Sequence, residues 1–125
     1  MTKIHIQTHG CSTNFSESEV MAGLLAEAGF EIIDNKESAD IIMINVCTVK
    51  GENTALREIR KIKEEFPSKK LIVAGCLTKV LIKNARKIDE SISLINTHNI
   101  KSICEFVEEV SEGNIVGLLA TEKEI

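Results

Sequence analysis

Short apolar and β-branched runs alternate with amphipathic stretches along the whole chain. The runs have the length of strands, and the stretches between them repeat their apolar positions about every 3.6 residues, as helices do. We therefore predict a strand followed by a helix, repeated along the chain. The predicted strands are residues 4–7, 31–33, 41–46, 71–74 and 93–95, with a further short strand at 115–118.

Apolar residues on a shared face predict the helices between these strands. The first helix is expected at residues 16–28, with Val20, Leu24 and Leu25 facing inward, because Gly29 provides a stop. The others are expected at residues 53–66, shortly after Cys76, and at residues 100–110. The inward residues of the second and fourth helices are predicted to be Leu56, Ile59, Ile62, Lys63, Ile103, Phe106, Val107 and Val110.

This alternation predicts an α/β fold, a three-layer doubly wound parallel sheet of about five strands, flavodoxin-like or Rossmann-like. Strands 41–46 and 71–74 are almost entirely apolar, which is typical of strands covered on both faces. We expect them at the centre of the sheet. Residues 1–118 are expected to form one domain, and residues 119–125 read as the start of a linker.

Composition narrows the class of protein. A chain of 125 residues with 43% hydrophobic side chains can bury one core. It contains no apolar run of 18 residues, so we expect a soluble, cytoplasmic protein that does not bind a membrane. Four cysteines without a Cys-x-x-Cys pair argue against a disulfide framework and leave metal binding or buried thiols.

The charge is unevenly distributed. Residues 57–87 hold ten Lys or Arg against three Glu, a net charge of +7, although the whole chain carries −4. This segment is either a solvated helix with a Lys-rich turn or a surface that faces a partner or RNA. The chain has no Tyr or Trp and only four Phe, so it offers little for stacking on bases.

Three cysteines follow predicted strands. Cys11 comes just after the first strand, Cys47 ends the third, and Cys76 ends the fourth. In a sheet of order 2-1-3-4-5 these strands are neighbours, so their carboxyl ends converge where such sheets bind ligands. Gly10 and Gly75 precede two of the cysteines and leave room for a tight turn and a bulky group.

Three converging thiolates suit a soft metal, either an iron–sulfur cluster or zinc. Helix N-termini beside the strand ends favour thiolates and the negative charge of a cluster. Because a closed structural site takes four protein ligands, three ligands would leave one metal position open. The alternative is that these cysteines are small buried apolar residues.

The remaining candidates are weaker. Cys104 falls within the fourth helix and is expected to be a core thiol, and His5 and His98 are expected to be a strand-face residue and a turn residue. His9, two residues before Cys11, either tunes a metal site or packs in the turn. Two asparagines near the cysteines either cap a helix or orient a ligand loop, namely Asn14 and Asn45.

Three ordered motifs resemble the N-terminal domain of the tRNA methylthiotransferases, a family of radical S-adenosylmethionine enzymes. They are Thr-His-Gly-Cys-Ser-Thr-Asn at 8–14, Asn-Val-Cys-Thr-Val at 45–49, and Val-Ala-Gly-Cys-Leu at 73–77. His9 stands where Tyr is usual, and Val46 where Thr is frequent. The pattern is most similar to the archaeal and eukaryotic branch, which modifies N6-threonylcarbamoyladenosine next to the anticodon.

The resemblance implies that Cys11, Cys47 and Cys76 hold an auxiliary 4Fe-4S cluster with an open iron. In the complete enzymes a radical SAM domain, whose second 4Fe-4S cluster cleaves S-adenosylmethionine, and an RNA-binding domain follow. Their Cys-x-x-x-Cys-x-x-Cys motif does not occur here. The isolated chain is therefore expected to be catalytically inactive, and tRNA is expected as a partner through the complete enzyme.

Two other classes of function fit parts of the sequence. In a cysteine phosphocarrier, Cys11 would accept a phosphoryl group at a helix N-terminus, but Cys47 and Cys76 would then have no role. In a metal-free protein-interaction module, the +7 segment would be the docking surface.

Overall fold

The computed structural model describes residues 2–10, 12–47, 52–96, 102–113 and 117–118. Six strands in this part form one all-parallel sheet of order β2-β1-β3-β4-β5-β6. This topology confirms the predicted doubly wound sheet and its 2-1-3-4-5 order. The strands are β1 Lys3–Thr8, β2 Glu31–Ile32, β3 Ile41–Val46, β4 Lys70–Gly75, β5 Ser93–Asn96 and β6 Gly117–Leu118.

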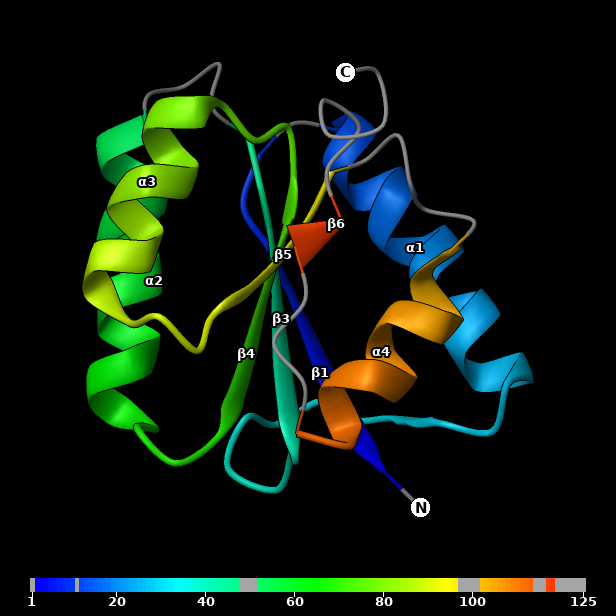
Figure 1. The fold of residues 1–125 in the computed structure, drawn as a ribbon. Helices are drawn as coiled ribbons and strands as arrows, with labels where there is room; N and C mark the ends of the chain where they lie inside the picture. The colour runs from blue at the N-terminus through cyan, green and yellow to red at the C-terminus, as the bar shows by residue number, and fades with distance from the viewer. Residues whose placement is uncertain (1, 11, 48–51, 97–101, 114–116, 119–125) are drawn as a thin grey trace.

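Helices cover both faces of the sheet and give three layers. Helices α2 and α3 lie on one face, and α1 and α4 lie on the other (Figure 1). Each helix connects two parallel strands, whereas β2 leads to β3 through residues 33–40 without a helix, so the predicted alternation of strand and helix is interrupted there. The helices are α1 Ser12–Glu27, α2 Glu52–Glu65, α3 Lys79–Ile88 and α4 Ile103–Ser111.

The central strands carry the core. Every residue of β3 is buried, as are five of the six residues of β4. Successive side chains of a strand point to opposite faces of the sheet. The side chains of β3 and β4 therefore pack into two apolar clusters, one under each helical layer. The predicted inward residues of the second and fourth helices are all buried, which confirms both faces.

The prediction for the first helix was partly wrong. The helix begins at Ser12 rather than Ser16, and Val20, expected to face inward, is 53% exposed. The buried residues of α1 are Asn14, Ser18, Met21 and Leu25. Leu25 is buried and Leu24 is partly buried, as predicted, but the first two inward positions of the helix are polar, so the apolar pattern alone predicted a later start.

The other elements match the predicted ones to within a few residues. The third helix follows Cys76, with Thr78 as its N-cap, whose hydroxyl accepts a hydrogen bond from the backbone N–H of Leu81 at 3.1 Å. The predicted strand at 115–118 and the start of the predicted helix at 100–110 fall partly outside the described residues. None of the helices in the described ranges is long and apolar enough to cross a membrane.

Candidate functional site

The carboxyl ends of β1, β3 and β4 lie side by side. The register pairs Thr8 with Asn45, and Val46 with Gly75. Cys47 and Cys76 each follow one residue after that second pair, so they leave neighbouring strands at the same level, where strands are about 4.8 Å apart. The backbone N–H of Cys76 continues the ladder by donating to the Val46 carbonyl at 3.4 Å. Cys47 is half-buried and Cys76 is exposed.

The end of β1 lies against Cys47. The backbone N–H of His9 donates to the Asn45 carbonyl at 2.8 Å, which carries the β1–β3 ladder one residue further. A Cβ placed on Gly10 would lie only 2.8 Å from the Cβ of Cys47. The turn that leads into Cys11 therefore packs directly on the Cys47 side chain. Cys11 itself lies outside the described residues.

Gly10 and Gly75 are required by this close packing. Both have positive φ angles, +153° and +127°. A side chain on Gly75 would collide with the Val46 carbonyl oxygen and lie 3.0 Å from Asn45 Oδ1. Because it has no side chain, Gly75 can lie directly against the end of β3.

A buried polar network lies beneath the strand ends. Asn14 and Asn45 are 2% and 0% exposed. The Asn45 side-chain amide donates to the Asn14 carbonyl at 2.9 Å and to Ser18 Oγ at 3.0 Å. Asn14 Nδ2 donates in turn to Asn45 Oδ1 at 3.3 Å and to the Val46 carbonyl at 3.2 Å. The network joins the first turn of α1 to the last residues of β3.

This network excludes the helix-capping interpretation of the asparagines, and their role in orienting a ligand loop stays a prediction. Asn14 lies inside α1 and Asn45 inside β3, so neither caps a helix, and both hold the segments that carry Cys11 and Cys47. Ser18 and Thr8 complete the network through a 2.7 Å hydroxyl contact, and sequence reasoning missed both. The spacing of Asn14, Ser18, Met21 and Leu25 would have revealed Ser18, because it follows one helical face.

The histidines have structural partners. His5 Nδ1 lies 3.0 Å from the Ile33 carbonyl, in agreement with its expected place on the strand face. The His9 ring contacts the Gln7 side chain, and its Nε2 lies 3.5 Å from Glu58 Oε1 of α2. His9 therefore packs between β1 and α2, while its influence on a metal site stays a prediction. His98 lies outside the described residues.

Cys104 is separate from the strand-end cysteines. Its thiol donates to the Leu24 carbonyl at 3.3 Å, so it lies between α4 and α1. It is half-buried and packs against the apolar cluster on the α1 and α4 face of the sheet. Burial raises the pKa of the Cys104 thiol, and Glu108 and Glu27 raise it further. A protonated thiol that packs between helices agrees with its expected structural role.

The donor set at the strand ends fits a soft metal centre. Among the described residues no group of three His, Cys, Asp or Glu side chains is placed to hold a metal ion, and this part of the chain lacks Cys11. What it contains is two cysteines at one level on adjacent strands and a glycine turn, packed on one of them, that leads to the third. Thiolates in this arrangement select iron–sulfur clusters or zinc.

Comparison with known proteins assigns the family. The model of "Uncharacterized protein family UPF0004" matches residues 3–97, which include all three strand-end cysteines. This chain belongs to that family. The match begins with the first residue of β1 and extends past the last residue of β5, and therefore includes the carboxyl ends of β1 to β5.

Relatives of this UPF0004 chain carry methylthiotransferase names. It is 38% identical to the human threonylcarbamoyladenosine tRNA methylthiotransferase over 98% of the chain and 21% of the relative. It is 34% identical to a probable enzyme of the same name from Methanothermobacter thermautotrophicus, over 89% of this chain and 26% of the relative. It is 39% identical to a tRNA-2-methylthio-N(6)-dimethylallyladenosine synthase from Aquifex aeolicus, over 81% and 25%. These identities over most of the chain confirm the predicted resemblance to tRNA methylthiotransferases, and the chain spans about a quarter of the length of these relatives.

Solved structures share the fold of the UPF0004 chain. A response regulator from Thermotoga maritima superposes with a TM-score of 0.63 at 23% identity, over 88% of this chain and 97% of that one. The isolated REC domain of RcsB from Salmonella enterica serovar Typhimurium superposes with a TM-score of 0.67 at 10% identity, over 93% of this chain and 92% of that domain. At these identities the likeness concerns the fold alone.

Proposed function

We propose that this chain is the cluster-binding part of a cytoplasmic tRNA methylthiotransferase and that Cys11, Cys47 and Cys76 hold a 4Fe-4S cluster. One observation carries the proposal: the ends of β1, β3 and β4, each followed by one of these cysteines, lie side by side at one level of the sheet. Residues 1–118 would form this domain, and residues 119–125 would lead to a radical SAM domain.

The surroundings of the strand ends support a bulky, negatively charged group there. Gly10 and Gly75 keep side chains away from the edge, and α1 and α3 begin within three residues of Cys11 and Cys76. The N-terminal end of a helix carries partial positive charge, which favours thiolates and an anionic cluster. The asparagine network would fix the position of Cys47 relative to Cys11 before any metal binds.

Three cysteines would leave one iron of the cluster without a protein ligand. When bound, such a cluster offers that open position to an exogenous sulfur species. This domain would thus hold the sulfur for insertion, while a second 4Fe-4S cluster and S-adenosylmethionine in the radical SAM domain would activate the RNA base. The chain lacks the Cys-x-x-x-Cys-x-x-Cys motif and would be inactive alone.

The proposed substrate is tRNA with N6-threonylcarbamoyladenosine next to the anticodon. The names of the human and M. thermautotrophicus relatives support this nucleoside, and the name of the A. aeolicus relative supports dimethylallyladenosine. A radical SAM domain and an RNA-binding domain of the same protein would be the partners.

Anaerobic reconstitution with iron and sulfide tests the cluster. We expect about four irons and four sulfides per chain, and loss of them in Cys11→Ser, Cys47→Ser and Cys76→Ser. Cys104→Ser is the matched control, because its thiol lies between α1 and α4, and it should bind iron as the unaltered chain does. Absence of a cluster in the unaltered chain would contradict the proposal and favour a phosphocarrier or a metal-free module.

A further inference from the structure

Helix α3 carries a stripe of positive charge. Lys79, Lys83, Arg86 and Lys87 recur at spacings that place them within an arc of about 100° on a helix of 3.6 residues per turn. Leu81 and Ala85 occupy the opposite side and are fully buried. These four cations, the α3 basic stripe, therefore face away from the core over a length of about 12 Å.

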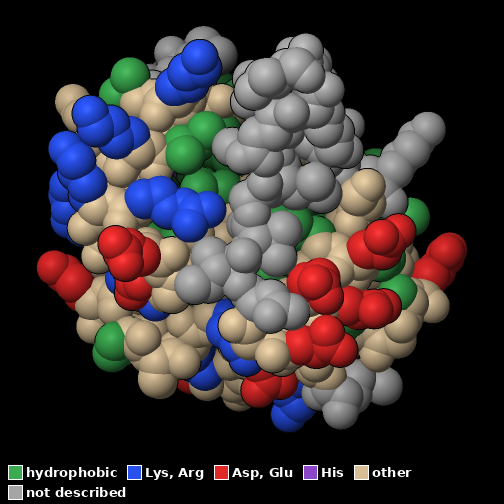
Figure 2. Space-filling model, viewed as in Figure 1, with side chains coloured by type: hydrophobic (Ala, Val, Ile, Leu, Met, Phe, Trp, Pro, Cys, Tyr) green, Lys and Arg blue, Asp and Glu red, His purple; other side chains and the backbone are tan. Residues whose placement is uncertain are grey.

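The two helical layers have opposite charge. Helix α3 contains four cations and no acidic residue, whereas α1 and α4 together contain six Glu and no Lys or Arg. Figure 2 shows Lys and Arg gathered mainly on the side of α2 and α3, and Asp and Glu mainly on the side of α4. The +7 segment found in the sequence is thus concentrated on one layer of the molecule.

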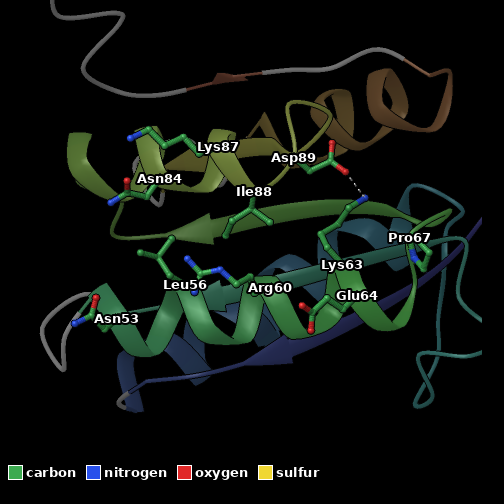
Figure 3. Close-up of a pocket in the computed structure, with 10 residues that line it drawn as sticks. All are labelled: Asn53, Leu56, Arg60, Lys63, Glu64, Pro67, Asn84, Lys87, Ile88 and Asp89. Atoms are coloured by element: carbon green, nitrogen blue, oxygen red, sulfur yellow. Dashed lines mark ion pairs between the residues drawn. The ribbon is translucent and has the colours of Figure 1, made fainter.

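Most of this charge is not neutralised within the protein. Lys63 of α2 pairs with Asp89 at 3.2 Å, but Lys79, Lys83 and Lys87 have no ion-pair partner among the described residues. Lys87 also borders a groove of about 650 Å³ between α2 and α3, and Arg60 lines the groove from the α2 side (Figure 3). Glu64 and Asp89 also line this groove, so the exposed stripe on α3, rather than the groove, is the part that suits an anionic partner.

The stripe begins beside the candidate cluster site. Lys79 is three residues after Cys76, so its backbone lies within about 10 Å of that cysteine. The stripe then runs away from the carboxyl edge of the sheet along α3. A chain of phosphates on the stripe would hold one of its ends next to Cys76.

We propose that the α3 basic stripe is a docking surface for the sugar–phosphate backbone of RNA, which it guides toward the strand-end cysteines. The inference rests on the proposed function, since it takes tRNA as the substrate. A stripe of 12 Å spans on the order of three phosphates. Helix α3 has no aromatic residue, so the contacts fix position without reading bases.

The test measures binding of an unmodified tRNA transcript to the chain before reconstitution, at several salt concentrations. Lys79→Gln, Lys83→Gln and Lys87→Gln are combined in one variant, because Gln keeps helix propensity and removes charge. Log affinity falls as log salt rises, and each lost phosphate contact should make this negative slope shallower by about 0.7 to 0.9. For the triple variant we expect a slope that is shallower by about 2 to 3. Its affinity at low salt should fall about tenfold or more.

A second triple variant controls for net charge. Lys3→Gln, Lys36→Gln and Lys70→Gln remove the same charge, but Lys3 and Lys70 are the first residues of β1 and β4, and Lys36 precedes β3. These lysines are at the amino ends of the strands, at the edge of the sheet opposite Cys76 and Lys79, and should leave affinity within about twofold of the unaltered chain. Lys83→Gln alone should lower the slope by about 1 if the triple variant fails to fold.

The outcomes separate the docking surface from the proposed function. No RNA binding by the unaltered chain, or an equal effect of the two triple variants, would overturn the docking surface. Unchanged RNA binding by the α3 variant would also overturn it and point to an acidic protein surface as the partner. Iron binding is scored separately, since both triple variants keep all cysteines. Failure to bind iron would contradict the proposed function without altering the RNA comparison.

Discussion

Asn45 is the residue on which the candidate site depends most. Replacing it with alanine removes two donated hydrogen bonds and one accepted hydrogen bond from a fully buried position. We expect Asn45→Ala to lower the unfolding free energy by about 1 to 3 kcal/mol and to speed loss of iron from the reconstituted chain. Urea unfolding and iron counts over time provide the measurement.

Asn53→Ala is the matched control for this substitution, because Asn53 is exposed at the start of α2. It should change stability by no more than about 0.5 kcal/mol and leave iron retention unchanged. If Asn45→Ala and Asn53→Ala behaved alike, the asparagine network would not be what holds the strand ends.

Cys104 should be the slower-reacting thiol of the metal-free chain. Burial and two glutamates raise its pKa, so less thiolate is present at pH 8, whereas Cys76 is exposed. We expect iodoacetamide to modify Cys76 first and Cys104 later, with the Cys104 rate still rising above pH 9. Mass spectrometry of the digested chain measures both rates, and faster modification of Cys104 than of Cys76 would contradict its placement.

At the scale of elements, Gly75 joins β4 to the turn that carries Cys76. Gly75→Ala should destabilise the chain by about 1 to 3 kcal/mol, because its φ is +127° and a Cβ would meet the Val46 carbonyl. Gly23→Ala is the control, since nothing lies within 4 Å of a Cβ there. It should stabilise α1 by up to about 1 kcal/mol. Equal denaturation midpoints for the two variants would argue against the close packing.

Asp89, at the C-terminal end of α3, should make stability depend on acidity. Hydrogen bonds from Ser91, with a smaller contribution from Lys63, hold the pKa of Asp89 below its usual 3.8. The stability that ionised Asp89 contributes is fully present above its unfolded-state pKa. It is lost as the pH falls through the lower pKa of the folded state. Between pH 5 and pH 2, the unfolding free energy measured with urea should fall more steeply for the unaltered chain than for Asp89→Asn. Parallel curves would contradict the assignment.

Elements with a regular apolar pattern were predictable from the sequence. Strand β3 and the inward face of α2 came directly from runs such as Ile41–Val46 and the 3.6-residue spacing of Leu56 and Ile59. The first half of the inward face of α1 was not predictable, because its two buried polar residues, Asn14 and Ser18, have their hydrogen-bond partner in β3. Hydrogen bonds between distant segments leave no trace in a local apolar pattern.

At the scale of the whole molecule, the cysteines were predictable as a group because sheet topology determines where they meet. Parallel strands with helical crossovers bring all carboxyl ends to one edge, and the order 2-1-3-4-5 makes the three cysteine-bearing strands neighbours. The charge contrast between layers was visible only as an uneven distribution along the chain. The fold adds that α2 and α3 lie on one face of the sheet, and the acidic helices α1 and α4 on the other.

We propose that Cys11, Cys47 and Cys76 together hold one cluster. The measurement that tests it most directly is anaerobic alkylation of the unaltered, reconstituted chain, followed by mass spectrometry before and after iron is removed by a chelator. We predict that these three cysteines resist alkylation while iron is bound and become reactive together when it is removed, whereas Cys104 reacts at the same rate in both states. Alkylation of any of the three at an unchanged rate, with iron still bound, would contradict the account.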